Sequence, residues 1–186
     1  MSQRTLVLLA VLVPVLALFL LFGVRLVQTG GQPAGIGINS VFGEVNVQPR
    51  QAQQFSLVLL SGSQTSLQDL RGKVVMVDFW SSWCPPCREE APTLARMYQK
   101  YKEKDVVFLG VAIWDSEPEV KQFIKQNNLA YANGLDSRGI IAIDYGVKGI
   151  PEKYFIDRHG NVIRKFIGPV TEEQLSKVLD ELLASP

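Results

Sequence analysis

Two cysteines, Cys84 and Cys87, are spaced so that their thiols can close a small disulfide ring and open it again. They follow an apolar run and precede a stretch with helical periodicity, so Cys84 is expected at the start of a helix. Free N–H groups and the dipole at a helix start can lower a cysteine pKa from about 8.5 to about 3.5–7.5. A thiolate at Cys84 attacks a partner disulfide, and Cys87 then resolves the mixed disulfide. The pattern predicts thiol–disulfide exchange.

The residues around the two thiols suit this chemistry. Pro85 fixes its backbone where the first helical turn needs no donor, Pro86 stiffens the link further, and Trp83 is expected to cover the disulfide. Half of a metal site and two structural thiols are the alternatives. A structural zinc site needs four ligands, whereas the chain holds two cysteines and one histidine, His159, in a predicted turn. We therefore expect no metal and no cofactor.

Composition limits the remaining function classes. The chain has 186 residues, which allows one ordinary domain plus a tail. With 19 Lys+Arg against 18 Asp+Glu it offers no basic field for nucleic-acid phosphates. Two cysteines also exclude a disulfide-dense secreted scaffold.

An apolar run of 19 uncharged residues, 6–24, stands near the N-terminus. As a helix it would reach about 28 Å, close to the thickness of a bilayer core. A cleaved signal peptide is the alternative, but such peptides have apolar cores of only about 7–15 residues and a small-residue cleavage site. We expect a transmembrane signal anchor over 1–27, a flexible Gly-rich tether over 28–45 and a folded domain over 46–186.

The rest of the chain reads as an α/β domain with a mixed central sheet flanked by helices. Early strands and helices alternate, and the chain ends in a hairpin and a helix that opens at Thr171. Expected strands are Phe55–Leu60, Val74–Phe79, Val106–Ile113, Lys153–Ile156 and Val162–Ile167; expected helices are Cys84–Tyr101, Glu117–Asn127 capped by Ser116, Ile140–Tyr145 and the C-terminal one.

The stretch from Val77 to Pro92, VDFWSSWCPPCREEAP, resembles the active-site segment of the thioredoxin superfamily. Its Trp-Cys-Pro-Pro-Cys-Arg-Glu-Glu form is similar to the membrane-tethered TlpA/ResA/CcmG (DsbE) group of thiol–disulfide oxidoreductases. The match continues through Tyr145–Glu152, YGVKGIPE. The resemblance implies a thioredoxin-like fold and a redox-active Cys84–Cys87 disulfide.

The resemblance also places a cis-proline at Pro151, against the disulfide. A cis bond there would turn the backbone of Ile150 outward, where it could pair with an extended substrate chain. The alternative is an ordinary trans-proline that opens the next strand.

Three carboxylates match family positions. Asp78 corresponds to the buried acid of thioredoxins, and burial would raise its pKa so that it accepts the proton of Cys87. The strand Val106–Ile113 lacks the lysine that usually accompanies this acid, so a purely structural Asp78 is the alternative. Glu90 matches an acid that tunes the thiol pKa, or is a first-turn glutamate stabilised by the helix dipole. Glu152 shapes substrate choice, or is a solvated charge at a strand end.

By this resemblance the protein is a reductase outside the cytoplasm that acts on oxidised Cys-x-x-Cys-His segments of apocytochrome c. Electrons would come from a membrane thiol transporter of the CcdA/DsbD type. A single-pass protein of the inner membrane with its domain on the periplasmic side is expected. Alternatives are a general extracytoplasmic thiol reductase, a TlpA-like donor for copper-enzyme assembly, a Cu(I) metallochaperone and a scaffold with an idle disulfide.

Overall fold

A computed structural model describes residues 3–28 and 37–185. The chain divides into two units, one up to Gly37 and a compact one from Ile38 onward. The first unit contains helix α1 (Gln3–Gln28), which carries Pro14 in its interior. Within the described residues, no helix is both long enough and apolar enough to cross a membrane. The expected anchor over residues 1–27 therefore stays a prediction.

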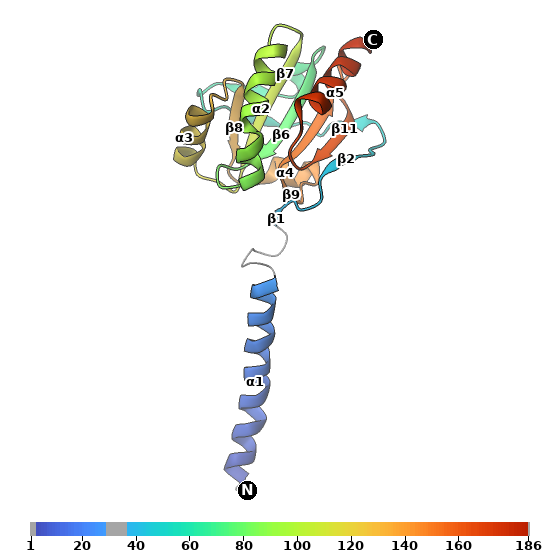
Figure 1. Ribbon diagram of the computed structural model, residues 1–186. Coiled ribbons are helices and arrows are strands. Elements are labelled where there is room, and N and C mark those ends of the chain that lie inside the picture. Colours follow the sequence, from blue (N-terminus) through green and yellow to red (C-terminus); the bar gives the residue numbers. More distant parts are fainter. Residues whose placement is uncertain (1–2, 29–36, 186) are drawn as a thin grey trace. The chain divides into compact units, whose positions relative to one another are not determined.

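The compact unit is built on a mixed sheet of seven strands among the described residues (Figure 1). β6 (Val74–Trp80), β7 (Val106–Ile113) and β8 (Ala132–Asp136) run parallel. β10 (Glu152–Ile156), β11 (Asn161–Ile167) and the short β2 (Gly43–Val45) continue the sheet in antiparallel pairs on the other side of β6. β3 (Arg50–Gln51) also pairs with β11. The redox motif follows β6, which lies in the middle of the sheet.

The two faces of β6 pack against different aromatic side chains. Every residue of this strand is buried, as expected for a sheet covered by helices on both sides. Side chains alternate between the faces. Phe79 packs against Tyr145 and Tyr154. Trp80, one residue later, packs against Phe123 with ring centroids 5.0 Å apart.

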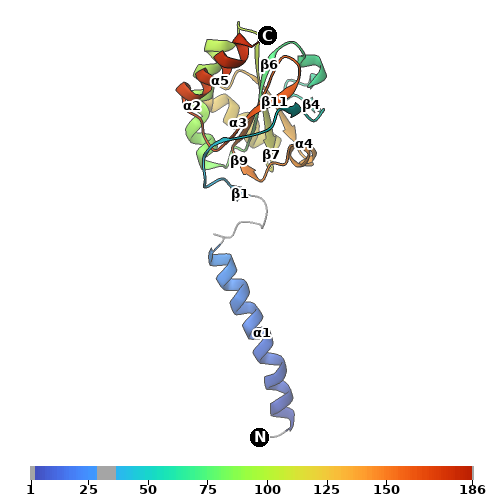
Figure 2. The ribbon, with the colours of Figure 1, turned by 90° about the vertical axis from the view of Figure 1, so that its right-hand side faces the viewer.

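Helices cover both faces of the sheet. α2 (Pro85–Tyr101) and α5 (Glu172–Ala184) lie side by side on one face, with α3 (Glu117–Asn127) next to α2. Right-handed crossovers between parallel strands place α2 and α3 on the same face. α4 (Ile140–Tyr145) covers the opposite face (Figure 2). The CXXC helix therefore starts directly above the carboxyl end of β6.

The smaller elements are β1 (Gly37–Ile38), β4 (Ser56–Val58), β5 (Gln64–Ser66), the 3-10 turn Gln68–Leu70 and β9 (Gly149–Ile150). β4 and β5 form a hairpin, and β9 pairs with β1 outside the main sheet.

Most expected elements are confirmed, and three points differ. Strand β8 was not expected, because its sequence ANGLD has little apolar or β-branched character. Ser116 stands at the start of α3, but its side chain makes no capping hydrogen bond, whereas Thr171 and Gln174 form the expected capping box. Residues 38–45, expected as part of the tether, belong to the compact unit because β2 pairs with β11; residues 29–36 lie outside the described residues.

Candidate active site

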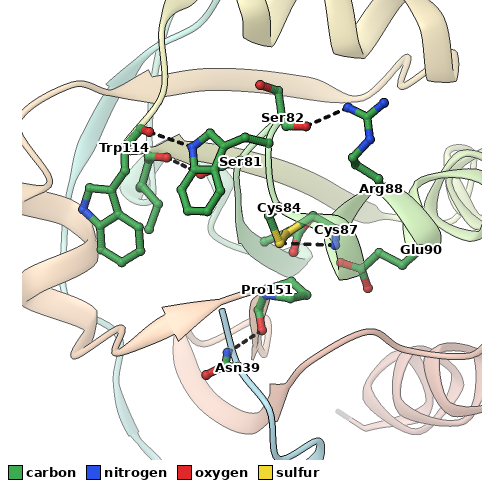
Figure 3. Close-up of a disulfide and its surroundings, with 12 residues drawn as sticks. Asn39, Ser81, Ser82, Cys84, Cys87, Arg88, Glu90, Trp114 and Pro151 are labelled. Carbon is green, nitrogen blue, oxygen red and sulfur yellow. Dashed lines mark hydrogen bonds between the residues drawn. A yellow bond between two sulfur atoms is a disulfide. The ribbon is translucent and has the colours of Figure 1, made fainter. Parts of the chain in front are cut away.

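The redox centre is a disulfide between Cys84 and Cys87 at the N-terminus of α2 (Figure 3). Their Cα atoms are 5.3 Å apart. Cys84 is the N-cap residue, and its Sγ accepts a hydrogen bond from the N–H of Cys87 at 3.3 Å. Pro85 and Pro86 occupy the first two helical positions, where no N–H donor is needed. The helix start thus places an N–H donor on Cys84 Sγ, an arrangement of the kind that stabilises a thiolate.

Both cysteines are buried, with 0% and 3% of their surface exposed, whereas Trp83 next to them is 44% exposed. The Nε1–H of Trp83 donates to the carbonyl of Trp114 at 2.9 Å. Trp114 adopts a positive φ of 53°, which is rare for a bulky side chain. The next residue, Asp115, accepts the N–H of Ser82 at 2.6 Å. The turn after β7 therefore holds the loop that leads into the disulfide.

The Ile150–Pro151 bond is cis, as the resemblance implies. Pro151 lies between the disulfide and Asn39 in Figure 3. The carbonyl of Ile150 accepts the N–H of Asn39 at 2.9 Å, and the carbonyl of Pro151 accepts the side-chain amide of Asn39 at 3.0 Å. The backbone that was expected to pair with substrate is thus hydrogen-bonded to Asn39, at the start of the compact unit.

Beneath the disulfide lies a buried cluster of three charges. Lys153 stands opposite Asp78 in the register of β10 and β6, so the two side chains share a face of the sheet. The Lys153 Nζ lies 3.1 Å from Asp78 Oδ1, an ion pair outside hydrogen-bond geometry, and donates to Glu90 Oε1 at 2.6 Å. Glu90 reaches down from α2, and its other oxygen accepts the N–H of Val170 at 3.1 Å. All three side chains are almost fully buried.

Burial dominates the electrostatics of this cluster. It raises the pKa of Asp78 above its ordinary value, against the opposing effect of Lys153. Burial also raises the pKa of Glu90 to about 7, while Lys153 opposes the rise and the charge of Asp78 adds to it. The pKa of Lys153 is raised although burial lowers it, because both carboxylates hold the proton on the ammonium. The cluster therefore contains one carboxyl group, Glu90, whose pKa burial brings to about 7.

A small cavity connects this cluster with the second thiol. Its volume is about 10 Å³, room for about one water molecule, and its lining includes Cys87, Asp78, Glu90 and Trp80. Among the described residues, Asp78 Oδ1 and Trp80 Nε1 find no hydrogen-bond partner although both are buried, and a water in this cavity would offer them one. Cys87 consequently faces groups that can take its proton.

Burial excludes the solvated-charge interpretation of two carboxylates, while their expected roles at the site stay predictions. Glu90 is no first-turn surface glutamate, because it is only 4% exposed and holds Lys153. Glu152 is no solvated strand end either. It is 1% exposed, pairs with Lys165 at 2.7 Å and accepts the N–H of Lys148 at 3.3 Å. The buried Glu152 carboxylate thus anchors the backbone of Lys148, in the loop before Pro151.

Lys153 is the site residue that the sequence analysis missed. The partner lysine for Asp78 was sought on Val106–Ile113, which is the neighbouring strand β7 on the parallel side. It comes instead from β10 on the antiparallel side. The available indication of a buried charge was the position of this lysine in the strand sequence EKYFI, directly before three large hydrophobic residues.

Comparison with known proteins gives the same picture. The Redoxin family model matches residues 48–182. The chain is 37% identical over 133 residues to the thiol-disulfide oxidoreductase ResA of Bacillus cereus, covering 72% of this chain and 77% of that protein. It is 36% identical over 118 residues to the thiol:disulfide interchange protein HelX of Rhodobacter capsulatus, covering 62% and 65% of the two chains.

Solved structures agree with the fold. A thiol:disulfide interchange protein of the thioredoxin family from Chlorobium tepidum superposes with a TM-score of 0.67 at 30% identity, covering 75% of this chain and all of the other. A secreted disulfide oxidoreductase of Mycobacterium tuberculosis, described as homologous to DsbE of E. coli, gives 0.63 at 28% identity and covers 69% and 96% of the chains.

Proposed function

Since this chain belongs to the Redoxin family, as a thioredoxin-superfamily protein of the ResA/CcmG type, we propose that its Cys84–Cys87 pair reduces protein disulfides outside the cytoplasm. The protein is a thiol–disulfide oxidoreductase. The observation that carries the proposal is the placement of the disulfide at the N-terminus of α2, against Pro151.

The exchange uses both thiols in order. The Cys84 thiolate attacks a substrate disulfide, one substrate sulfur leaves as a thiolate, and a mixed disulfide forms. Cys87 loses its proton to the buried cluster and attacks Cys84 Sγ, which releases the second substrate thiol. The substrate gains two electrons, and the protein ends as the Cys84–Cys87 disulfide.

The residues between the thiols support the direction of a reductase. Both are prolines, so no histidine stands between the cysteines to over-stabilise the Cys84 thiolate. A strongly stabilised thiolate favours the reduced form and makes a protein an oxidant. The absence of such a histidine therefore favours a protein that donates electrons. The donor that returns electrons to the pair is proposed to be a membrane thiol transporter of the CcdA/DsbD type.

The substrate proposal is an oxidised Cys-x-x-Cys-His segment of an apocytochrome c before haem attachment. It is supported by the resemblance to the CcmG (DsbE) group, which extends to Glu152 directly after Pro151. Attachment to the membrane through residues 6–24, with the domain on the outer side, belongs to the same proposal. Its support is the uncharged 19-residue run in the sequence.

Single-cysteine variants test the proposal. A Cys87→Ala variant should accumulate a mixed disulfide with a peptide that carries an oxidised Cys-x-x-Cys-His segment, because nothing resolves it. Cys84→Ala should form none and lose turnover. A matched peptide with alanine in place of histidine separates the substrates. Equal trapping of both peptides would replace the apocytochrome role by a general reductase, and retained turnover in either variant would overturn the two-thiol mechanism.

A further inference from the structure

Asn39, at the start of the compact unit, lies on the loop beside the disulfide. Asn39 uses two donors there: its backbone N–H bonds the carbonyl of Ile150 at 2.9 Å, and its side-chain amide bonds the carbonyl of Pro151 at 3.0 Å. The N–H of Gly168, the residue after β11, also donates to the Pro151 carbonyl at 2.8 Å. Figure 3 shows Asn39 and the disulfide on opposite sides of Pro151.

The carbonyl of Ile150 is the group that an added strand needs. β9 (Gly149–Ile150) lies outside the main sheet beside the redox centre, and its strand partner among the described residues is the short β1. An extended polypeptide binds such an edge through main-chain hydrogen bonds. Asn39 already satisfies this acceptor in the way that a substrate residue would.

We propose that residues 38–39 act as an internal competitor for extended polypeptide substrates at the backbone edge of Ile150. The inference rests on the proposed function, because it needs a polypeptide substrate. Such a substrate pairs with Ile150 only after the Asn39 hydrogen bonds have opened. The apparent affinity for a polypeptide substrate then equals the intrinsic affinity multiplied by the fraction of molecules in which this edge is open. The reactivity of the thiols does not change.

The contact is weak enough to be displaced. Two hydrogen bonds in a partly exposed place favour the closed arrangement by a factor of about five to thirty. Ser40, the next residue, is exposed and offers a neutral position for a control substitution. A short main-chain contact of this kind selects against weakly binding segments without blocking strong ones.

The test uses the full chain in its reduced form, with Asn39→Pro, Asn39→Ala and Ser40→Ala variants. Asn39→Pro removes both donors and should lower KM for a linear peptide with an internal Cys-x-x-Cys disulfide about five- to thirtyfold at constant kcat. Asn39→Ala keeps the backbone donor and should give a smaller decrease. Ser40→Ala should match the parent. Reaction with the small disulfide 5,5′-dithiobis(2-nitrobenzoic acid), which needs no strand pairing, should proceed at the parent rate in all variants.

The outcomes separate the inference from the proposed function. Parent-like KM values in Asn39→Pro and Asn39→Ala, with turnover intact, would overturn the competitor and leave the reductase standing. Equal acceleration with the small disulfide would also overturn it, because the segment would then shield the sulfurs and not the edge. Failure of the parent itself to reduce the peptide would overturn both.

Discussion

The ammonium of Lys153 lies 3.1 Å from Oδ1 of Asp78, across the antiparallel ladder between β10 and β6. The same ammonium donates to Glu90 at 2.6 Å, so one cation serves two carboxylates. Taking charges out of water is costly, and a buried ion pair is stable only when its geometry repays that cost. Because Lys153 lies on β10, which begins directly after the cis-proline, this strand positions the cation that the buried carboxyl groups near Cys87 share.

Replacement of this lysine tests the cluster. Lys153→Met keeps an unbranched side chain that is one atom shorter, and it leaves Asp78 and Glu90 without the cation. We expect a loss of about 3–5 kcal/mol in the free energy of unfolding at pH 8, as for other buried pairs that lose one partner. The loss should be smaller at pH 5, where the carboxyls take up protons. Chemical denaturation at both pH values measures it.

The exposed Lys125→Met on α3 is the matched control and should change stability little at either pH. An equal loss for Lys153→Met at pH 5 and pH 8 would mean that packing, not charge, accounts for the role of Lys153.

Glu90 gives the oxidised protein a defined pH dependence. Its pKa is raised to about 7 by burial, from an ordinary 4.5. Between these values the folded protein binds more protons than the unfolded chain, so stability falls as pH rises from about 4.5 to about 7. The fall attributable to Glu90 is on the order of 3 kcal/mol. Glu90→Gln should remove it, and an unchanged slope in that variant would assign the titration elsewhere.

Asp78 is expected to take the proton of Cys87 during resolution. Asp78→Asn keeps the shape but cannot accept a proton. The mixed disulfide should therefore resolve about tenfold more slowly near neutral pH, because Glu90 is then the one carboxyl group left among the described residues that line the cavity. Rapid acid quenching of the mixed disulfide gives the rate, and Asp144→Asn, which is exposed, serves as control. If Asp78→Asn resolved the mixed disulfide at the parent rate throughout about pH 6–9, Asp78 would have a structural role only.

Gly110, on β7, leaves room for the side chains of Trp80 and Asn133. A Cβ at this position would lie 2.9 Å from Trp80 Nε1 and collide with the side-chain amide of Asn133. Gly110→Ala should destabilise the protein by about 1–3 kcal/mol, the usual result of overpacking. Adding Asn133→Ala should recover part of the loss, which a double-mutant cycle measures. Parent-like stability of the single variant would show that the strand adjusts freely.

The elements that position the disulfide could be predicted because their sequence patterns are strong. The bounds of β7, α3 and α4 agree with the expected ranges, and Cys84 stands at the expected helix start. Apolar runs and helical spacing indicate which residues are buried, so these elements can be predicted without knowing which segments they pack against.

The contacts between distant segments could not be predicted in the same way. Lys153 meets Asp78 only because β10 pairs antiparallel with β6 in one particular register. Asn39 reaches Ile150 across 111 positions of the chain, and nothing in the local composition of residues 28–45 marks that contact. β8 is defined by its parallel neighbour β7, not by its own residues.

The reduction potential of the Cys84–Cys87 pair tests the central claim most directly. The full chain would be equilibrated in thiol redox buffers, and the fraction of disulfide would be followed by alkylation. A reductase fed with electrons across a membrane should have a potential near or below roughly −270 mV, the value of thioredoxin. A potential above about −180 mV would make the protein an oxidant or isomerase and would contradict the proposed reduction of apocytochrome disulfides.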